Sequence, residues 1–329
     1  MNDPTPPDSE RRYEAWMPEN VIDASARISD ARDCGLGQAR MSSSKFVRPF
    51  HGVRSLTVAE TPLQRARQYL SKLKREQWFG GITAMRLWGI PVPHRWDVAE
   101  PVRLVVPHDA YRPCSRGVRA SGLVKRRIVA ANLDGLRLLE PAQAVLSAAE
   151  ELSIEDMVVA FDALVTDSAI YPGRHAALGT WTIEQIAAEI AAWGGGSAAK
   201  RGKAALEFVR VGVDSPQESR LRFAIVNAGL PEPVLQHEIA IDGKLRRLDT
   251  AWPEWRVGAE YEGDHHRTDA VQWHEDVGRE RSISLQDWQL VRVTARDLRS
   301  EHRPSLMKAF WRALTRRGWN PEDAKNFET

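Results

Sequence analysis

The chain contains 329 residues, of which 43% are hydrophobic, and its 46 Lys and Arg residues nearly balance its 44 Asp and Glu residues. This length predicts two domains, and the hydrophobic content is sufficient for two buried cores. A formal net charge of only +2 excludes a protein that attracts nucleic acid through its overall charge. Any contact with nucleic acid must therefore come from local patches of basic residues.

The cysteines and the N-terminal residues indicate in which cellular compartment the protein is expected. Cys34 and Cys114 are the two cysteines in the sequence, which excludes a disulfide framework and is typical of a reducing environment. The N-terminal stretch MNDPTPPDSERRYEAW has no apolar segment of the kind found in signal peptides, and no apolar run approaches the length that spans a membrane. We therefore expect a cytoplasmic protein with no membrane partner.

The N-terminal half is expected to begin with a tail. Residues 1–45 are polar and have no periodic apolar pattern, so we expect them to be disordered or loosely attached. A smaller α/β domain should follow over residues 46–165, where Thr61 and Pro62 are typical of the start of a helix. Further helices are expected at 83–88, 141–152 and 154–165, and a buried strand is expected at 102–106.

The densest basic run of the sequence lies within residues 115–127 of this domain. Two interpretations stay open: a solvated surface, or a surface that contacts the DNA backbone. The interpretation as a DNA-contacting surface has a chemical basis, because Lys and Arg bind phosphates without regard to base sequence. In that interpretation the nucleic-acid-binding residues are Arg116, Arg119, Lys125, Arg126 and Arg127.

Two segments of the same domain, FGGITAMRLWGIPVP and LEPAQAVLSAAEELSIEDMVVAFDALV, carry a family resemblance. They resemble the middle region of AbiEi-type antitoxins and related regulator-like proteins. FVRPFHGVRS, at residues 46–55, resembles the end of the winged helix with which such proteins open, although the helices of that winged helix are not found. The resemblance includes no catalytic motif. It implies an antitoxin-like regulator with a toxin or defence-system partner.

Residues 166–212 are expected to form a helical connector between the two domains. A helix is expected at 183–193 because apolar residues recur at helical spacing there, and the triple glycine 194–196 should end it. A second helix is expected at 200–211. The C-terminal domain then occupies residues 213–318, and a short tail follows at 319–329.

The centre of the C-terminal domain is a predicted β-hairpin. Two runs of alternating character, 245–252 and 255–262, flank the short interruption Pro253-Glu254, and such a pattern predicts an antiparallel pair of strands. If those two residues form the whole turn, Trp252 pairs with Trp255.

This register predicts where the acidic residues of the hairpin lie. Asp249 falls opposite Gly258, and Asp249, Glu260 and Glu262 share one face because side chains alternate along a strand. Glu260 is then the diagonal neighbour of Asp249, about 7–8 Å away at the base of the side chain. Hard divalent cations prefer oxygen ligands, so the two carboxylates are candidates to share one ion.

Three segments of this domain, SPQESRLR, LDTAWPEWRVGAEYEGDHH and WQLVRVTARDL, carry a second resemblance. They resemble the PD-(D/E)xK nuclease core, and in particular the branch related to very-short-patch-repair endonucleases. The resemblance implies an α/β (α+β) chain whose C-terminal domain is a restriction-endonuclease-like mixed sheet flanked by helices. It also implies an endonuclease that uses Mg²⁺ or Mn²⁺ to hydrolyse DNA, in repair or in defence.

The sequence departs from that core at one position. The usual lysine, two residues after the second acid, is Glu262 here. Glu262 is expected either to hold a second ion or to repel the phosphate. The departure leaves a second function open, a catalytically degenerate module that binds DNA without cleaving it.

Two of the expected metal ligands also have a structural interpretation. Glu218 is expected to bind the ion with Asp249 and Glu260, yet with Ser215 it also fits a capping box at the start of a helix. Glu260 lies opposite Arg247 in the predicted register, so a cross-strand ion pair is its alternative.

The remaining catalytic candidates follow the hairpin. His265 is expected to act as a general acid or base, because histidine titrates near neutral pH, or to be an ordinary surface histidine. Arg279, on a helix expected at 268–285, is expected to bring positive charge near the site. A last strand at 289–293 and a basic helix at 305–317 complete the predicted domain.

Overall fold

The computed structural model describes residues 25–33, 44–241, 244–262 and 287–322. Helices and mixed sheets alternate along the chain, so the expected α/β (α+β) class is confirmed. The chain separates into two compact units: unit 1 contains residues 1–151, 175–178 and 189–199, and unit 2 contains 152–174, 179–188 and 200–329. Over the described ranges, no helix is both long enough and apolar enough to cross a membrane.

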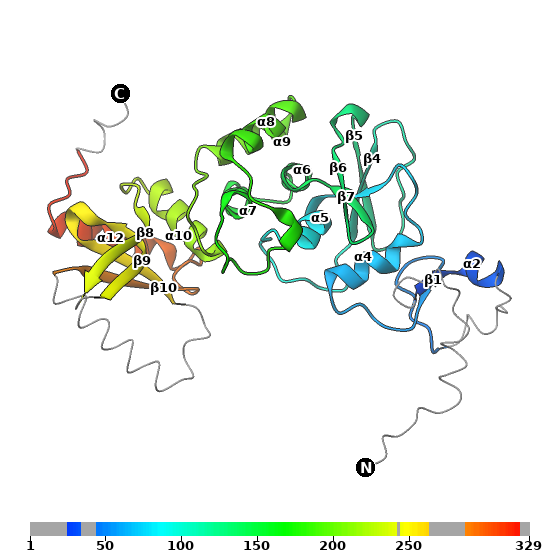
Figure 1. Cartoon of the computed structure of the whole chain (residues 1–329), viewed down its shortest axis with the longest axis horizontal. Helices are drawn as coiled ribbons and strands as arrows, with labels where there is room; N and C mark the ends of the chain where they lie inside the picture. Colours follow the sequence, from blue (N-terminus) through cyan, green and yellow to red (C-terminus); the bar gives the residue numbers. More distant parts are fainter. Residues whose placement is uncertain (1–24, 34–43, 242–243, 263–286, 323–329) are drawn as a thin grey trace, which may run out of the picture. The chain divides into compact units, whose positions relative to one another are not determined.

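Unit 1 is built around a five-stranded sheet with the strand order β5-β4-β3-β7-β6 (Figure 1). The pairs β3–β4 and β6–β7 are antiparallel, whereas β3–β7 and β4–β5 are parallel. The strands are β3 (Trp78–Phe79), β4 (Val102–Pro107), β5 (Val118–Leu123), β6 (Ala130–Leu133) and β7 (Leu136–Leu139).

Strand β4 confirms the strand expected at 102–106, because its nearly continuous apolar run is buried. Strand β5 was not predicted. It forms an edge of the sheet, and most of its side chains are at least partly exposed. An edge strand of this kind does not need the apolar alternation by which strands are recognised in a sequence.

Three helices expected from the sequence lie in unit 1 and start near the indicated residues, although the one expected at 141–152 already ends at Ser147. They are α4 (Pro62–Leu70), α5 (Gly81–Trp88) and α6 (Pro141–Ser147). The Thr61 hydroxyl accepts the Gln64 backbone N–H at 3.2 Å, which caps α4. Gly89 ends α5 with a φ of 69°, a conformation that favours glycine. Helices α5 and α6 follow the neighbouring strands β3 and β7 and pack against each other.

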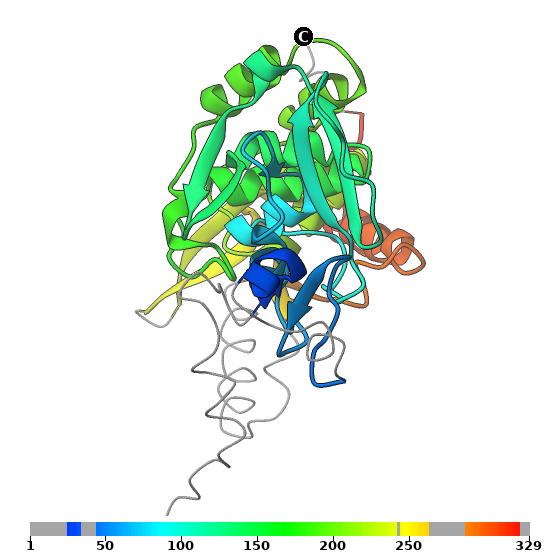
Figure 2. The same cartoon turned by 90° about the vertical axis from the view of Figure 1, so that its right-hand side faces the viewer.

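A second, two-stranded sheet in unit 1 corrects part of the expected N-terminal tail. Strand β1 (Ser25–Arg27) pairs with β2 (Val53–Ser55), and α2 (Ile28–Asp33) follows β1. The short sheet contacts α4 and lies below the larger sheet in Figure 2. Residues 25–27 are held by backbone pairing with a distant segment, so no local apolar pattern marks them.

Unit 2 contains a four-stranded sheet with the order β11-β10-β9-β8 (Figure 1). The pairs β8–β9 and β9–β10 are antiparallel, and β10–β11 is parallel. Helices α10 (Pro216–Asn227) and α12 (Arg303–Arg316) share an apolar core with the sheet, which includes Leu221, Trp252 and Phe310. The strands are β8 (Val234–Ile241), β9 (Lys244–Trp252), β10 (Val257–Glu262) and β11 (Gln289–Thr294).

The predicted hairpin exists as β9–β10, but its two-residue turn is wrong. A 3₁₀ turn at Pro253–Trp255 is followed by Arg256 in the left-handed conformation, with a φ of 49°. Trp252 therefore pairs with Val257 instead of Trp255, and Gly258 lies opposite Ala251 instead of Asp249. The longer turn thus shifts the register of every pair in the hairpin by two residues.

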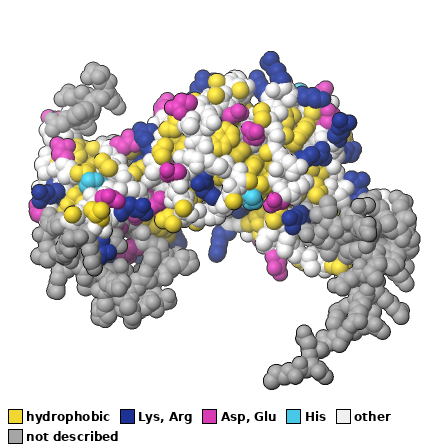
Figure 3. Space-filling view, viewed as in Figure 1, with side chains coloured by type: hydrophobic (Ala, Val, Ile, Leu, Met, Phe, Trp, Pro, Cys, Tyr) yellow, Lys and Arg dark blue, Asp and Glu magenta, His cyan; other side chains and the backbone are white. Residues whose placement is uncertain are grey.

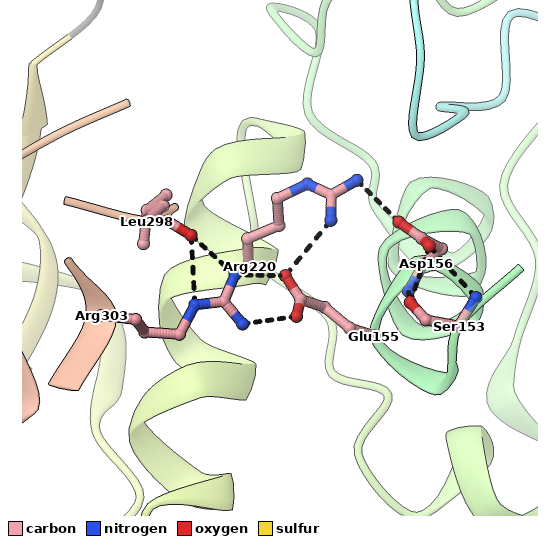
Figure 4. Close-up of polar contacts among 6 residues, drawn as sticks. All are labelled: Ser153, Glu155, Asp156, Arg220, Leu298 and Arg303. Atoms are coloured by element: carbon pink, nitrogen blue, oxygen red, sulfur yellow. Dashed lines mark hydrogen bonds and ion pairs between the residues drawn. The ribbon is translucent and has the colours of Figure 1, made fainter. Parts of the chain in front are cut away.

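Helix α7 (Ile154–Val165), which the sequence analysis placed in the first domain, packs against α10 in unit 2. Arg220 of α10 pairs with Asp156 at 2.9 Å and with Glu155 at 3.2 Å (Figure 4). Glu155 also accepts two hydrogen bonds from Arg303 of α12, at 2.6 and 3.0 Å. The sequence indicates the helix at 154–165 itself, but not the helices that pack against it.

Two further helices lie between α7 and α10 in the sequence. Helix α8 spans Ile183–Trp193, as predicted, and α9 spans Ser197–Leu206, slightly earlier than expected. Gly194 and Gly196 separate them with positive φ angles of 82° and 105°. The triple glycine therefore ends α8, as the sequence indicates.

Candidate functional site

The site lies where the β9–β10 ladder ends. Its paired residues run from Trp252–Val257 to Thr250–Ala259, and Asp249 and Glu260 are the next residues along the two strands. The Asp249 carboxylate reaches towards β10 and accepts the backbone N–H of Tyr261, with a distance of 2.8 Å between Oδ2 and N. This hydrogen bond holds the Asp249 carboxylate beside the residue that follows Glu260.

The neighbouring strand β8 is irregular at the same level. Leu235 pairs with Thr250 and His237 pairs with Leu248, so the unpaired Gln236 faces Asp249 across the ladder. Gln236 has a φ of 49°, an unusual conformation for a non-glycine residue, which costs roughly 1–3 kcal/mol. Here the Gln236 amide donates to Glu218 Oε2 at 2.6 Å.

Glu218, at the start of α10, is buried and strongly hydrogen-bonded. Its Oε2 also accepts the Asp214 backbone N–H at 3.0 Å, and its Oε1 accepts the Ser215 hydroxyl at 2.8 Å. The Ser215 hydroxyl in turn accepts the Glu218 backbone N–H at 3.3 Å. Ser215 therefore caps α10, but only this half of the expected capping box is present, because the Glu218 carboxylate accepts the backbone N–H of Asp214 instead of that of Ser215.

The electrostatics of Glu218 connect it to Asp249. Burial raises the pKa of Glu218 to about 7, the hydrogen bond from Asp214 opposes this shift, and the nearby charge of Asp249 adds to it. The two carboxyl groups are thus close enough to influence each other's ionisation. Gln236, which the sequence analysis missed, bridges the two elements that carry them.

Glu262 forms an ion pair that was not predicted. Its Oε1 lies 2.7 Å from Nη1 of Arg292, on the adjacent strand β11. The expected ion-pair alternative for Glu260 is wrong, because in the observed register Arg247 is not opposite Glu260. Arg247 pairs instead with Asp214.

Two of the predicted catalytic residues, His265 and Arg279, lie outside the described residues. Within the described ranges, no three His, Cys, Asp or Glu side chains come together as a metal-binding group. The expected trio of Asp249, Glu260 and Glu218 is therefore not a ready-made ion site. Carboxylates from Asp249 and Glu260 still fit Mg²⁺, because this ion is commonly held by one or two carboxylates while water and phosphate oxygens complete its shell.

The predicted nucleic-acid-binding residues lie on and beside β5 in unit 1. Arg116, Arg119, Lys125 and Arg126 are exposed, whereas Arg127 is partly buried. Lys125 forms an ion pair with Glu76 at 2.7 Å. Figure 3 shows Lys and Arg side chains, in dark blue, gathered over the part of unit 1 that carries β4 and β5. The basic run thus forms surface, as both interpretations require.

The curated proteins to which this chain is similar have names that give no function. No family model matches the chain, and no solved structure matches it. Curated proteins from two strains of Mycobacterium tuberculosis, CDC 1551 and H37Rv, are each 32% identical to this chain over 97 residues, which is 29% of this chain. Each is named as an uncharacterized protein, and the matched segment spans 36% of its length. The function must therefore be argued from the site.

Proposed function

We propose that unit 2 is a metal-dependent DNA endonuclease domain that hydrolyses phosphodiester bonds. The observation that carries the proposal is the position of the Asp249 carboxylate at the end of the β9–β10 ladder, hydrogen-bonded beside Glu260. Among the described residues, the apolar core of the sheet is built from other side chains of the same strands, so the described core does not include these two acids.

In this proposal Asp249 and Glu260 hold one Mg²⁺ or Mn²⁺. The bound ion would lower the pKa of a coordinated water and neutralise charge on the phosphodiester. Glu218 is proposed as the third acid of the site, and the nearby charge of Asp249 adds to the burial that raises the pKa of Glu218. His265 is proposed as the general acid or base, at a position outside the described residues.

A second candidate function is a regulator that binds DNA without cleaving it. The observation that favours it is the acid at position 262, where a nuclease of the resembling family carries lysine. The exposed basic residues around β5 of unit 1 would serve either function, because phosphate contacts do not depend on cleavage. A toxin or defence-system partner also stays a prediction.

The deciding experiment measures DNA cleavage and metal binding on the same protein. Purified full-length chain is incubated with Mg²⁺ or Mn²⁺ and with supercoiled plasmid or mismatched duplex DNA. Thermal unfolding is followed with and without the ion, because a ligand that binds the native state stabilises it by about 2.7 kcal/mol at a hundred times its dissociation constant. Asp249→Ala and Glu260→Ala should abolish both effects.

A matched control comes from the same hairpin. Glu254 is an exposed acid in the turn between β9 and β10, and Glu254→Ala should cleave DNA and bind metal as the wild type does. If the wild-type protein binds DNA but shows neither ion-dependent stabilisation nor cleavage, the nuclease proposal fails and the binding module stands.

A further inference from the structure

Strand β11 brings an arginine next to the acidic residues of β10. In the parallel β10–β11 pair, Glu260 is in register with Arg292 and Glu262 with Thr294. Side chains in register on neighbouring strands point to the same face of a sheet. Arg292 therefore lies on the face that carries Glu260 and Glu262.

The intervening residues show which face this is. Ala259 and Val293 are fully buried in the core that the sheet shares with α10 and α12, so Arg292 lies on the face away from that core. The side chains of Arg292 and Glu262 are 38% and 41% exposed. They are accessible to a ligand, and their ion pair at 2.7 Å restrains both of them.

We propose that Arg292 contacts the phosphate group of the DNA strand that is cleaved, and that Glu262 is a positioning residue that orients the Arg292 guanidinium. The inference rests on the proposed nuclease function, because it assigns a substrate contact to the same site. A phosphate that approaches an ion held by Glu260 comes next to Arg292, the neighbour of Glu260 in the sheet.

The chemistry of the guanidinium fits this role. It offers five N–H donors in a planar fork that matches two phosphate oxygens, and it stays charged at every physiological pH. One of its terminal nitrogens, Nη1, holds the Glu262 carboxylate. A fixed positive group beside the phosphate stabilises the negative charge that builds up during hydrolysis.

The same arrangement accounts for an acidic residue at the position of the usual lysine. An isolated Glu262 would repel a phosphate, but its carboxylate is paired with Arg292, and the guanidinium supplies the N–H donors that the lysine would have supplied. A lysine at 262 would instead stand beside Arg292 and repel it. Glu262→Lys is therefore expected to lower cleavage, although it restores the residue usual in the family.

The experiment uses the full chain and two readouts. Cleavage of supercoiled plasmid is timed in Mg²⁺ or Mn²⁺, and affinity for a short fluorescent duplex is measured by anisotropy in Ca²⁺. The variants are Arg292→Gln, Arg292→Lys, Glu262→Gln and Glu262→Lys. Arg256→Gln is the matched control, because Arg256 is 57% exposed at the other end of the same hairpin and pairs with Asp287 at 3.8 Å.

Arg292→Gln should slow cleavage about 100-fold, a typical effect of removing one stabilising donor. It should also weaken binding to the duplex about 10-fold, as expected for a lost charged hydrogen bond. Arg292→Lys should fall between this variant and the wild type, because it keeps the charge but loses the fork. Arg256→Gln should stay within about twofold of the wild type in both readouts, the ordinary result for an exposed ion pair.

The outcomes separate this inference from the proposed function. Wild-type cleavage with an unaffected Arg292→Gln variant overturns the role of Arg292 and leaves the nuclease standing. If the wild-type protein does not cleave DNA, the proposed nuclease function fails, and the affinity for the duplex then tests the phosphate contact. A loss of affinity in Arg292→Gln but not in Arg256→Gln supports this contact. Unchanged affinity of Arg292→Gln overturns it. Unchanged unfolding temperatures of the variants show that each loss is not a folding defect.

Discussion

Arg222 and Asp162 form a buried ion pair inside unit 2, between α10 and α7. Nη2 of Arg222 lies 3.0 Å from Oδ2 of Asp162, and the two side chains are 1% and 0% exposed. Asp162 Oδ1 also accepts the backbone N–H of Arg210 at 2.9 Å. Burial raises the pKa of Asp162, and the charge of Arg222 opposes that shift. The pair thus ties together two helices on either side of the connector in the sequence.

Removing one partner of this pair should be strongly destabilising. Asp162→Asn leaves the Arg222 charge buried without its main partner, and such a change typically costs about 3–5 kcal/mol. The double variant Asp162→Asn/Arg222→Met should recover part of that loss, because no uncompensated buried charge remains. Urea unfolding of the full chain, followed by tryptophan fluorescence, measures both.

The control for this prediction is an exposed pair. Lys125 and Glu76 pair at 2.7 Å, with side chains 71% and 53% exposed. Lys125→Met should change the free energy of unfolding by less than about 1 kcal/mol. If Asp162→Asn costs no more than Lys125→Met, the buried pair does not stabilise the packing of α7 on α10.

The raised pKa of Glu218 predicts a pH dependence of stability. Its pKa moves from the usual 4.5 to about 7 on folding, mainly through burial. Between these two values the folded chain holds a proton on Glu218 that the unfolded chain has lost, so the free energy of unfolding falls as pH rises. The shift corresponds to roughly 3 kcal/mol at pH 8 relative to pH 4.

Glu218→Gln tests this directly, because glutamine keeps the shape of the side chain but does not titrate. The difference in unfolding free energy between wild type and variant should change in favour of the variant as pH rises from 5 to 8. Glu207→Gln, at an exposed acid of unit 2, should show no such change. Parallel pH profiles for wild type and Glu218→Gln would mean that burial does not raise the pKa of Glu218.

Local patterns predicted most of the helices in the described ranges, but not how they assemble. Helices α4, α5, α8 and α10 follow their capping residues and apolar periodicity closely, because both signals lie within the helix itself. The partner of α7 depends on Arg220 and Arg303, which are far away in the sequence. No periodic pattern contains that information.

The candidate site was only partly predictable for the same reason. Alternation located the hairpin that carries Asp249 and Glu260, but its register depends on the left-handed conformation of Arg256, which is a poor candidate for such a position by residue type. Gln236 and Arg292 reach the site from strands β8 and β11. Strand pairing places these two residues, and pairing between distant segments cannot be recognised in one sequence.

The basic surface of unit 1 gives a last prediction, about salt dependence. Arg116, Arg119 and Arg126 are exposed, whereas Lys125 already pairs with Glu76. If the three arginines contact DNA phosphates, replacing them together by glutamine should weaken binding equally for duplexes of different sequence. The slope of log affinity against log salt concentration should become shallower by about 0.9 for each lost contact.

Lys125→Gln is the matched control, because it removes one positive charge from the same surface but from a residue held by Glu76. Lys125→Gln should change the salt slope by less than the 0.9 expected for one lost phosphate contact. Filter binding or anisotropy between 50 and 200 mM salt measures the slope, since the logarithm of the affinity carried by phosphate contacts falls linearly with the logarithm of the salt concentration. Unchanged affinity of the triple variant at low salt would identify the basic run at 115–127 as solvated surface. Any contact with DNA would then be made by unit 2.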